Sequence, residues 1–470
     1  MTSEPILYWA RRDFRLEDNP ALVAAAAEGP VIPVFITDEV VETHGAAPKW
    51  RLGLGAEAFG KALSEAGSRL VVRRGKALDV LRALIAETGA KAVHWNRLYD
   101  PASRRRDEAV KAGLKSDGIR AESHAGHILF EPWTVETGSG GFYKVYKPFW
   151  KAVRGRDPGA PRRRPDLQAP GTWPGSDDLA DHRLGRAMNR GAAVVRPYLA
   201  VGEAAARDRL DGFMEEAIET YAEARDDLAR NGTSHLSENL TYGEIGPRTC
   251  WAAGRRALEE GKSDAETFLQ ELVWREFAYH LAYHTPRLVS GNWREEWDAF
   301  PWSENEDSAE VLAWKQGRTG IEMVDAGMRE MYVTGRMHNR VRMIVASYLT
   351  KHLMTHWKIG LKWFEDHLID WDPASNALGW QWSAGSGPDA TPYFRVFNPV
   401  TQAKRFDPKA AYRRQWIAEG QKAPPQGALD YFGAIPRRWG LSPSDPYPEP
   451  VVAPDEGRKI ALQTYENREF

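Results

Sequence analysis

The chain has 470 residues, with 63 Lys and Arg against 65 Asp and Glu, so its formal net charge is −2. Its length predicts two or three domains, and its 42% hydrophobic and 27% charged residues are typical of a globular protein. The single cysteine excludes an internal disulfide, and the balanced charge excludes a protein that coats nucleic acid along its whole surface. The sequence shows neither a signal peptide nor an apolar run that could cross a membrane, so we expect a cytoplasmic protein.

Tryptophan is unusually frequent in this chain. Of the 19 tryptophans, seven lie before residue 270 and twelve after it. Packing in the core is the simpler interpretation, and ring stacking or electron transfer is the alternative. Composition alone favours packing.

The first 130 residues alternate short apolar runs with helical patterns. The predicted strands are 6–9, 31–36, 69–73 and 91–95, and the predicted helices are 54–66, 77–88 and 103–115. This alternation predicts a parallel sheet covered by helices on both faces. Gly53-x-Gly55-x-x-Ala58 resembles a dinucleotide-binding loop, but no strand ends just before it, so we interpret it as the start of a helix.

A stretch rich in Pro, Gly and Arg, residues 154–176, predicts a long surface connection. After about residue 204 helical patterns dominate, as in 203–230, 264–284 and 324–357. The predicted fold class is an α/β N-terminal domain with a Rossmann-like parallel sheet, followed by a large all-α C-terminal domain. We place the α/β domain at 1–130, a linker at 131–203 and the helical domain at 204–470.

Two histidine pairs, His280/His284 and His352/His356, have the four-residue spacing that suits a metal ion on a helix. Neither pair has the glutamate of an HExxH motif, and no cysteine completes a site. We interpret these histidines as core or surface residues and expect no metal site.

The segment 335–414 combines positive charge with aromatic rings. It holds 12 Lys and Arg against 6 Asp and Glu, together with five tryptophans. Cations bind phosphates and aromatic rings stack on bases, so this segment predicts a nucleic-acid-binding face. A merely solvated basic face is the alternative, but it leaves the tryptophans unexplained.

Polar side chains in this segment gather in two places. In the helix that opens at 337–343, Asn339, Arg342 and Met343 share one face. The opposite face is an apolar stripe directed at the core, formed by Val341, Ile344, Val345, Tyr348 and Leu349. Residues 370–382 read as a loop that carries Asp370, Asp372 and Asn376 among three tryptophans. These groups predict a polar pocket beside the apolar core.

Five long motifs resemble the DNA photolyase/cryptochrome family. In chain order they are YWARRDFRLEDNPAL, GTSHLSENLTYGEIGPR, FLQELVWREFAYHL, MHNRVRMIVASYLTK and LIDWDPASNALGWQWSAGSGPDATPYFRVFNPVTQ. They extend from residue 8 to residue 402, so the resemblance covers most of the chain. It implies a light-driven flavoprotein that acts on DNA.

The resemblance implies that FAD, active in its reduced form, is bound by helices of the C-terminal domain. The implied cofactor-binding residues are Tyr221, Thr233, Ser234, His235, Leu236, Ser237, Arg275, Arg342, Asp370, Asp372 and Asn376. Tyr221 and the run 233–237 would hold the diphosphate, because free donors at a helix start suit an anion. Arg342 would pair with Asp370, and Asn376 would lie against the redox-active nitrogen of the flavin. Without the motifs, these acidic and amide side chains read as loop caps.

The resemblance also implies repair of cyclobutane pyrimidine dimers in ultraviolet-damaged DNA. The implied lesion- and DNA-binding residues are Arg225, Glu271, Trp274, Asn339, Arg340, Met343, Trp382 and Gln402. Glu271, Asn339, Met343 and Asn376 are the implied catalytic residues. In the family, (6-4) repair enzymes carry histidines where this chain has Asn339 and Met343, and plant-type cryptochromes usually lose the Glu/Trp pair. A blue-light-sensing cryptochrome without repair activity is the alternative.

Trp302, Trp357 and Trp380 match the family's electron-transfer chain. A second, antenna chromophore is also implied, but the Asn-Glu pair that clamps a folate in some members is replaced here by Ala102 and Ser103. A folate bound in another mode, a deazaflavin and no antenna all stay open. Residues 131–150 resemble bacterial members near the plant-cryptochrome branch, and this resemblance favours methenyltetrahydrofolate. We expect damaged DNA as the partner, no membrane contact, a monomer, and association with the nucleoid when DNA is bound.

Overall fold

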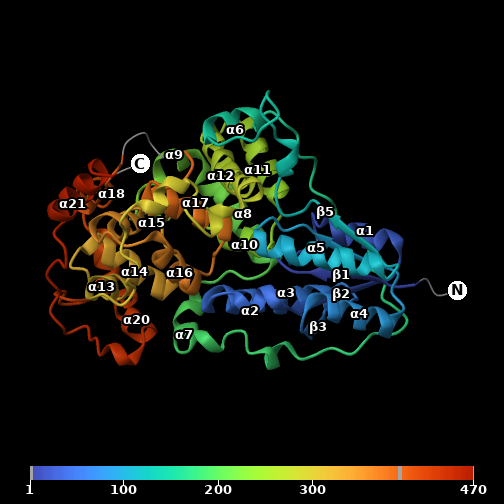
Figure 1. Cartoon of the computed structure of the whole chain (residues 1–470). Helices are drawn as coiled ribbons and strands as arrows, with labels where there is room; N and C mark the ends of the chain where they lie inside the picture. The colour runs from blue at the N-terminus through green and yellow to red at the C-terminus, as the bar shows by residue number, and fades with distance from the viewer. Residues whose placement is uncertain (1–3, 390–393, 469) are drawn as a thin grey trace. The chain divides into compact units, whose positions relative to one another are not determined.

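The computed structural model describes residues 4–389, 394–468 and 470, and the chain forms two compact units (Figure 1). The sheet unit comprises Met1–Arg186, Ala200–Glu219 and Ser234–Pro286. The helical unit comprises Ala187–Leu199, Thr220–Thr233 and Arg287–Phe470. Part of the last family motif, residues 390–393, lies outside the described residues.

Five parallel strands form the sheet. They are β1 (Ile6–Ala10), β2 (Val31–Thr37), β3 (Val71–Arg74), β4 (Ala92–Asn96) and β5 (Arg120–His124), in the spatial order β3-β2-β1-β4-β5. The four predicted strands and their parallel pairing are confirmed, and β5 was not predicted. The side chains of β1, β2 and β4 are all buried, because helices cover both faces of the sheet.

Separate apolar cores lie on the two faces of the sheet, one with Tyr8, Phe35 and Phe59 and the other with Trp9, Ile36 and Trp95. The helices of the first 130 residues are α1 (Pro20–Glu28), α2 (Glu39–Thr43), α3 (Ala46–Glu65), α4 (Ala77–Thr88) and α5 (Pro101–Ser116). The remaining helices of this unit are α6 (Tyr146–Val153), α8 (Glu203–Glu216), α10 (Ser237–Thr241), α11 (Pro247–Glu259) and α12 (Ala265–His284).

The interpretation of Gly53 and Gly55 as a helix start is wrong, because both lie inside α3. A Cβ on Gly55 would stand 2.9 Å from the ring of Phe14, and a Cβ on Gly53 would stand 3.1 Å from Leu184. These glycines therefore allow close packing around α3 and do not form a dinucleotide-binding loop at the end of a strand.

The predicted connection at 154–176 is confirmed, since no helix or strand occurs between α6 and the 3-10 turn Leu179–His182. Backbone hydrogen bonds attach it to the sheet unit: the Val31 N–H donates to Gln168 O at 3.0 Å and the Asp18 N–H to Arg162 O at 2.8 Å. The segment is thus an ordered covering of the sheet unit.

The helical unit is built around α14 (Glu322–Thr334), which is buried along most of its length. Its other helices are α7 (Gly191–Val195), α9 (Tyr221–Ala224), α13 (Ala309–Lys315), α15 (Asn339–Ser347), α16 (Trp357–His367), α17 (Pro373–Ala384), α18 (Pro399–Phe406), α19 (Ala411–Trp416), α20 (Gln426–Ala434) and α21 (Pro454–Glu466). The predicted apolar stripe of α15 is confirmed, since Val341, Ile344 and Val345 are fully buried.

Two of the long predicted helices are interrupted. The pattern at 203–230 divides into α8, the 3-10 turn Ile218–Thr220 and α9. The pattern at 324–357 is broken by Gly335, whose φ of 69° ends α14, and by His338, which caps α15; a π-turn, Tyr348–His352, then follows α15. The third, 264–284, corresponds to α12.

Residues 373–382 are helical, so the prediction of a loop over 370–382 is wrong for most of that stretch. Asp372 caps α17 by accepting a hydrogen bond from the Ser375 N–H at 2.8 Å, and Pro373 occupies the first helical position.

The predicted division into an α/β domain at 1–130, a linker at 131–203 and a helical domain at 204–470 stays a prediction. The two compact units divide the chain at other places, because Ser234–Pro286 packs with the sheet unit. Among the described residues no helix combines the length and apolar character of a membrane span.

Candidate functional site

The helical unit holds a partly buried ion pair between α15 and the residues that lead into α17. Arg342 Nη2 donates to both carboxylate oxygens of Asp370, at 2.9 and 2.8 Å, and Arg342 Nε donates to Met337 O at 2.7 Å. The Asp370 side chain is 5% exposed. Because Nη2 contacts both carboxylate oxygens while Met337 O holds Nε, the two side chains are fixed relative to each other and give this part of the unit a defined charge pattern.

Two further polar side chains follow along the start of α17. Asp372 is its cap, so the simpler interpretation of this residue as a capping group is realised in the structure. Asn376 Nδ2 donates to Asp372 O at 3.0 Å, and the exposed fractions of Asp372 and Asn376 are only 5% and 9%. Asp370, Asp372 and Asn376 thus form a buried polar row that can bind a ligand with both hydrogen-bond donors and acceptors.

Arg340 has a partner that the sequence analysis missed. Its Nη2 donates to the two carboxylate oxygens of Asp226 at 2.9 and 2.7 Å, and its guanidinium lies 4.6 Å from the ring of Phe406. Arg340 Nη1 also approaches Met343 Sδ at 3.9 Å, whereas Asn339 is exposed at the first position of α15. The positive charge of Arg340 is therefore largely balanced within this unit.

The other predicted residues of the helical unit lie on α9, α17 and α18. The Arg225 guanidinium lies 5.6 Å from the ring of Tyr221, which is itself buried. Trp382 packs against Phe397 with ring centres 6.1 Å apart. Gln402 Oε1 is buried and accepts no hydrogen bond from the described residues, so this oxygen is suited to an external donor.

Trp380 is packed against α16. Its ring occupies the space beside Gly360, where a Cβ would stand 2.0 Å from Trp380 Cη2. Phe364 and Trp314 contact the same ring edge-on, with centroid distances of 4.9 and 6.2 Å. The indole of Trp380 is therefore held in one orientation by apolar neighbours.

Trp357 and Trp302 are held in place by hydrogen bonds from their indole nitrogens. Trp357 Nε1 donates to Asn292 Oδ1 at 2.7 Å, and Trp302 Nε1 donates to Thr350 O at 2.9 Å. The ring of His356 lies 5.3 Å from Trp302 and 5.6 Å from Trp357, so it lies within contact distance of both indoles. The three predicted electron-transfer tryptophans thus occur on α16, on α17 and on the segment that pairs with residues 354–356.

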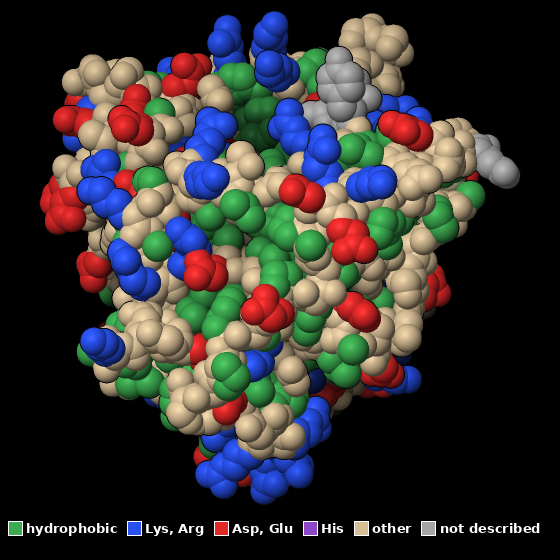
Figure 2. Space-filling model, turned by 90° about the vertical axis from the view of Figure 1, so that its left-hand side faces the viewer, with side chains coloured by type: hydrophobic (Ala, Val, Ile, Leu, Met, Phe, Trp, Pro, Cys, Tyr) green, Lys and Arg blue, Asp and Glu red, His purple; other side chains and the backbone are tan. Residues whose placement is uncertain are grey.

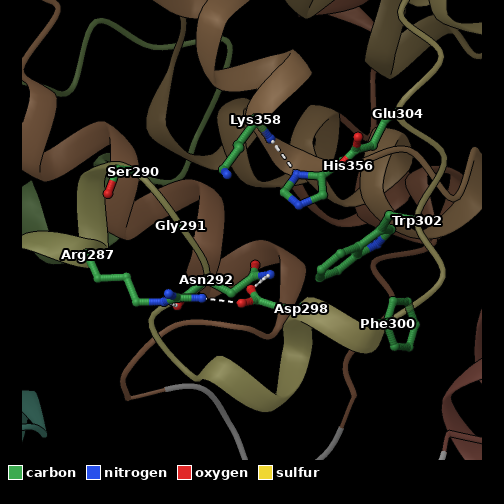
Figure 3. Close-up of a pocket in the computed structure, with 10 residues that line it drawn as sticks. All are labelled: Arg287, Ser290, Gly291, Asn292, Asp298, Phe300, Trp302, Glu304, His356 and Lys358. Carbon is green, nitrogen blue, oxygen red and sulfur yellow. Dashed lines mark hydrogen bonds and ion pairs between the residues drawn. The ribbon is translucent and has the colours of Figure 1, made fainter.

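A pocket of about 380 Å³ opens beside Trp302 (Figure 3). Phe300, Trp302 and His356 contribute rings to its wall, while Arg287 and Asn292 both contact Asp298 on its other side. Asn292 connects this pocket to the buried Trp357, because its Oδ1 accepts a hydrogen bond from Trp357 Nε1 and its Nδ2 donates to Asp298 at 2.8 Å. Of the three tryptophans predicted for electron transfer, Trp302 lines this pocket.

Figure 2 shows one face of the molecule, seen from the left-hand side of Figure 1. Lys and Arg side chains gather in its upper half around hydrophobic side chains. Several cations of the basic segment 335–414 are nevertheless engaged in ion pairs, among them Arg340, Arg342 and Arg413. Asp226 and Glu322, which pair with Arg340 and Arg413, lie outside the segment, so part of its excess positive charge is balanced by carboxylates that the composition of the segment does not count.

The sheet unit carries the predicted pair Glu271 and Trp274 on α12. Their spacing places both on one side of the helix, and both are partly exposed. The ring of Trp274 stacks on Tyr146, with centroids 3.6 Å apart and planes 8° apart. Tyr146 in turn donates its hydroxyl to Gln270 O at 2.6 Å. One face of Trp274 is therefore covered, and α6 fixes the orientation of the ring.

Arg275 is engaged within the sheet unit. Its Nη1 donates to His127 O at 2.8 Å, and its Nη2 lies 3.0 Å from His127 Nε2. The next residue, Glu276, accepts hydrogen bonds from the N–H groups of Leu129 at 2.6 Å and Phe130 at 3.2 Å. Burial raises the pKa of Glu276 to about 7. The sequence analysis did not single out Glu276, because neither its burial nor these partners are visible in the motif.

The run Thr233–Ser237 divides between the units, with Thr233 at the end of a helical-unit segment and Ser234–Ser237 at the start of a sheet-unit segment. His235 has a φ of 52°, and its carbonyl accepts from Arg209 Nη1 at 3.2 Å. Ser237 opens the short α10, which a fully buried ion pair anchors: Arg51 Nε lies 2.6 Å from Glu238 Oε1. This local rigidity explains how a polar run can hold one conformation.

Two family models match the chain. The FAD binding domain of DNA photolyase matches residues 268–467, and the DNA photolyase model matches residues 6–168. A deoxyribodipyrimidine photo-lyase of Agrobacterium fabrum is 43% identical, over 99% of this chain and 98% of that protein.

Solved structures agree with these matches. The crystal structure of a bacterial class III photolyase from Agrobacterium tumefaciens has a TM-score of 0.90 and 43% identity, and the match covers 99% of this chain and 98% of that one. An archaeal photolyase from Sulfolobus tokodaii, solved with two FAD molecules, has a TM-score of 0.80 and 28% identity, over 98% of this chain and 100% of that one. The predicted fold class is confirmed.

Proposed function

Because this chain belongs to the DNA photolyase/cryptochrome family, we propose that it is a deoxyribodipyrimidine photo-lyase, a light-driven enzyme that splits cyclobutane pyrimidine dimers in DNA. One observation carries the proposal: the region that matches the FAD-binding family model contains a buried row of acidic, amide and guanidinium groups on α15 and α17. Internal hydrogen bonds and the ion pair with Arg342 offset the cost of burying these groups, and they hold the row in one arrangement within the region that matches the FAD-binding model.

The polar row fits FAD. A flavin ring and its ribose present both donors and acceptors, and Asp370, Asp372 and Asn376 offer carboxylate and amide groups to match them. Arg342 pairs with Asp370 and orients its carboxylate, and Asn376 is the residue assigned to the redox-active edge of the ring. When bound in its reduced form, FAD supplies on excitation the electron that opens the cyclobutane ring and takes it back afterwards.

The diphosphate is assigned to the hydroxyls of Tyr221 and Thr233 in the helical unit and to Ser234, His235, Leu236 and Ser237 in the sheet unit. Hydroxyl groups and backbone N–H groups stabilise an anion. Arg275 is assigned to the cofactor as well, through a guanidinium that His127 already orients.

The lesion is assigned to a second set of residues. In the sheet unit, Glu271 donates or accepts a hydrogen bond to the dimer, and Trp274, supported from behind by Tyr146, stacks on it. In the helical unit, Asn339, Met343 and Trp382 contact the dimer, while Arg225, Arg340 and Gln402 contact the DNA. Base stacking on an aromatic side chain contributes about 1–3 kcal/mol per base, which helps offset the cost of unpairing the dimer.

Three further features belong to the proposal. Trp380, Trp357 and Trp302 carry electrons to the cofactor, and the fixed orientation of each indole supports this role. A second chromophore collects light, and we favour methenyltetrahydrofolate. We place the enzyme in the cytoplasm as a monomer, on the nucleoid when it binds DNA.

The proposal is tested with ultraviolet-irradiated DNA, blue light and a chemical reductant. We expect cyclobutane dimers to disappear only in illuminated samples that contain the enzyme. The absorption spectrum of the same preparation reports the flavin and any second chromophore. Flavin binding without dimer loss would instead favour a cryptochrome that senses light.

The tryptophan chain is tested separately with Trp380→Phe. Phenylalanine keeps an apolar ring beside Gly360 but is far harder to oxidise, so we expect photoreduction to be lost while chemically reduced enzyme still repairs DNA. Trp363→Phe is the matched control, because Trp363 lies on the neighbouring α16 and is assigned no role. Equal photoreduction in both variants would refute the chain.

A further inference from the structure

A group of side chains suited to a metal ion lies at the edge of the parallel sheet and includes none of the residues assigned above. His94 belongs to β4, and Glu122 and His124 belong to the edge strand β5. In the register of the sheet His94 pairs with Glu122, and His124 lies two residues farther along, so all three share one face. One ligand atom from each of the three side chains lies within 4.8 Å of the others.

The two imidazoles are almost in position to share an ion. His94 Nδ1 lies 3.0 Å from His124 Nε2, and the ring planes differ by 11°. Two nitrogens at ~2.0–2.1 Å from a tetrahedral Zn²⁺ stand about 3.3 Å apart. A small rotation of each ring therefore admits the ion, once both rings are neutral and carry their hydrogens on the outer nitrogens, His94 on Nε2 and His124 on Nδ1.

A carboxylate stands behind His94, as it does behind many metal-bound histidines. His94 is fully buried, and its Nε2 forms no hydrogen bond with the described residues. Glu28 Oε1, at the end of α1, lies 3.5 Å from this nitrogen. A hydrogen on Nε2 would be drawn to Glu28, which selects the tautomer whose Nδ1 is free to bind a metal.

A cation already balances the acidic groups of this cluster. Arg120, also on β5, forms an ion pair with Glu28, and its Nε lies 3.7 Å from Glu122 Oε1. Its side chain is 53% exposed, so it can turn to solvent and leave Glu122 to another cation. The negative charge here thus suits a cation, and the guanidinium competes for it.

We propose that His94, Glu122 and His124 bind a transition-metal ion of the Zn²⁺ class and so join the edge strand β5 to β4. Two imidazole nitrogens and one carboxylate oxygen are donors that Zn²⁺ accepts, whereas Mg²⁺ and Ca²⁺ prefer oxygen alone. Water fills the fourth position. The role is structural: the ion holds a polar edge strand in register, and repair needs no part of it.

The test uses the full-length protein with its flavin, freed of metal by a chelator and titrated with ZnCl₂ at pH 7.5 by calorimetry. We expect one equivalent to bind and the melting temperature to rise with Zn²⁺. His124→Ala and Glu122→Gln should each weaken binding at least tenfold, and Glu28→Gln less strongly. Arg120→Gln should tighten it several-fold, because the competing cation is gone. Co²⁺ in place of Zn²⁺ should give the absorption bands of a tetrahedral site.

His284→Ala is the control, since His284 belongs to a histidine pair on α12 and should leave Zn²⁺ binding unchanged. Absence of stoichiometric binding, or unchanged affinity in both His124→Ala and Glu122→Gln, overturns the site. If His124→Ala does not fold, Glu122→Gln and Arg120→Gln decide, and unchanged affinity in both overturns it equally. Dimer repair should be the same in all variants, so this result is independent of the proposed activity.

Discussion

Single side chains in this protein are understood through their partners. The pair of Arg342 and Asp370, 28 positions apart, was expected from the family resemblance, and the structure contains it. The pair of Arg340 and Asp226 spans 114 positions, and the stacking of Trp274 on Tyr146 joins α12 to α6. No local pattern predicts such partners, because only the folded chain brings them together.

Glu276 gives a prediction at this scale. In the folded protein burial raises its pKa from 4.5 to about 7, so between these values the folded state binds a proton that the unfolded state has lost. The free energy of unfolding should therefore fall as the pH rises through this window, by roughly 3 kcal/mol for this group. Glu276→Gln stays neutral and still accepts from Leu129 and Phe130, so its stability should lose that dependence.

Urea unfolding at pH 5 and pH 7.5 measures the difference. Glu266→Gln on the same helix is the control, because Glu266 is exposed. A wild-type pH dependence that survives in Glu276→Gln would show that Glu276 is ionised without cost.

Among the elements, those with a strong apolar pattern could be predicted from the sequence. β1, β2 and β4 are apolar and were predicted, whereas β5, with sequence RAESH, is too polar for any such signal and is defined by its pairing with β4. α17 was read as a loop although Asp372, Pro373 and Ser375 form a helix-start signal.

The contact of α16 with α17 gives a prediction at this scale. Gly360→Ala would place a Cβ 2.0 Å from Trp380 Cη2, so the ring or the helices must shift. Overpacking of this kind costs about 1–3 kcal/mol, which outweighs the roughly 1 kcal/mol that alanine contributes to a helix. We expect a lower melting temperature and slower flavin photoreduction.

Gly379→Ala is the matched control on α17. Apart from the backbone of α17 itself, no atom of the described residues lies within 4 Å of a Cβ at Gly379, so this substitution should raise the melting temperature slightly. Equal behaviour of the two variants would contradict the close packing of Trp380 on Gly360.

For the whole molecule, the near-zero net charge follows from the numbers of basic and acidic residues, and ion pairs further reduce the number of cations available to a ligand. The chain carries a net charge of −2, and Arg340, Arg342 and Arg413 each face a carboxylate. Binding of DNA must therefore use a limited number of cations. The logarithm of the affinity should fall with the logarithm of salt concentration by about 0.9 for each phosphate contacted, with a total of only a few units.

Asp226→Asn tests this at one position. The variant frees the charge of Arg340, so we expect tighter binding of irradiated DNA at low salt and a slope steeper by about 1. Asp227→Asn is the control, because Asp227 caps a local turn through the Ala229 N–H. Fluorescence anisotropy over a series of salt concentrations gives both slopes, and identical slopes would mean that Arg340 does not meet a phosphate.

The fold class could be predicted because periodicity, turn residues and the order of elements all indicated the same architecture. The assignment of each segment to a compact unit could not, because it depends on packing between residues far apart in the chain. The segment Ser234–Pro286 is helical like the rest of the C-terminal half, yet it packs with the sheet unit.

Because the two units are interleaved along the chain, neither can complete its fold early in synthesis. The chain passes from one unit to the other at residues 186/187, 199/200, 219/220, 233/234 and 286/287. A ribosome that has made all five strands still lacks α11 and α12, so the nascent sheet unit stays incomplete until Pro286 has left the exit tunnel. A single cut in the chain therefore cannot separate the two units as stable fragments. A truncated protein that ends after β5 should fail to fold and should be degraded by proteases.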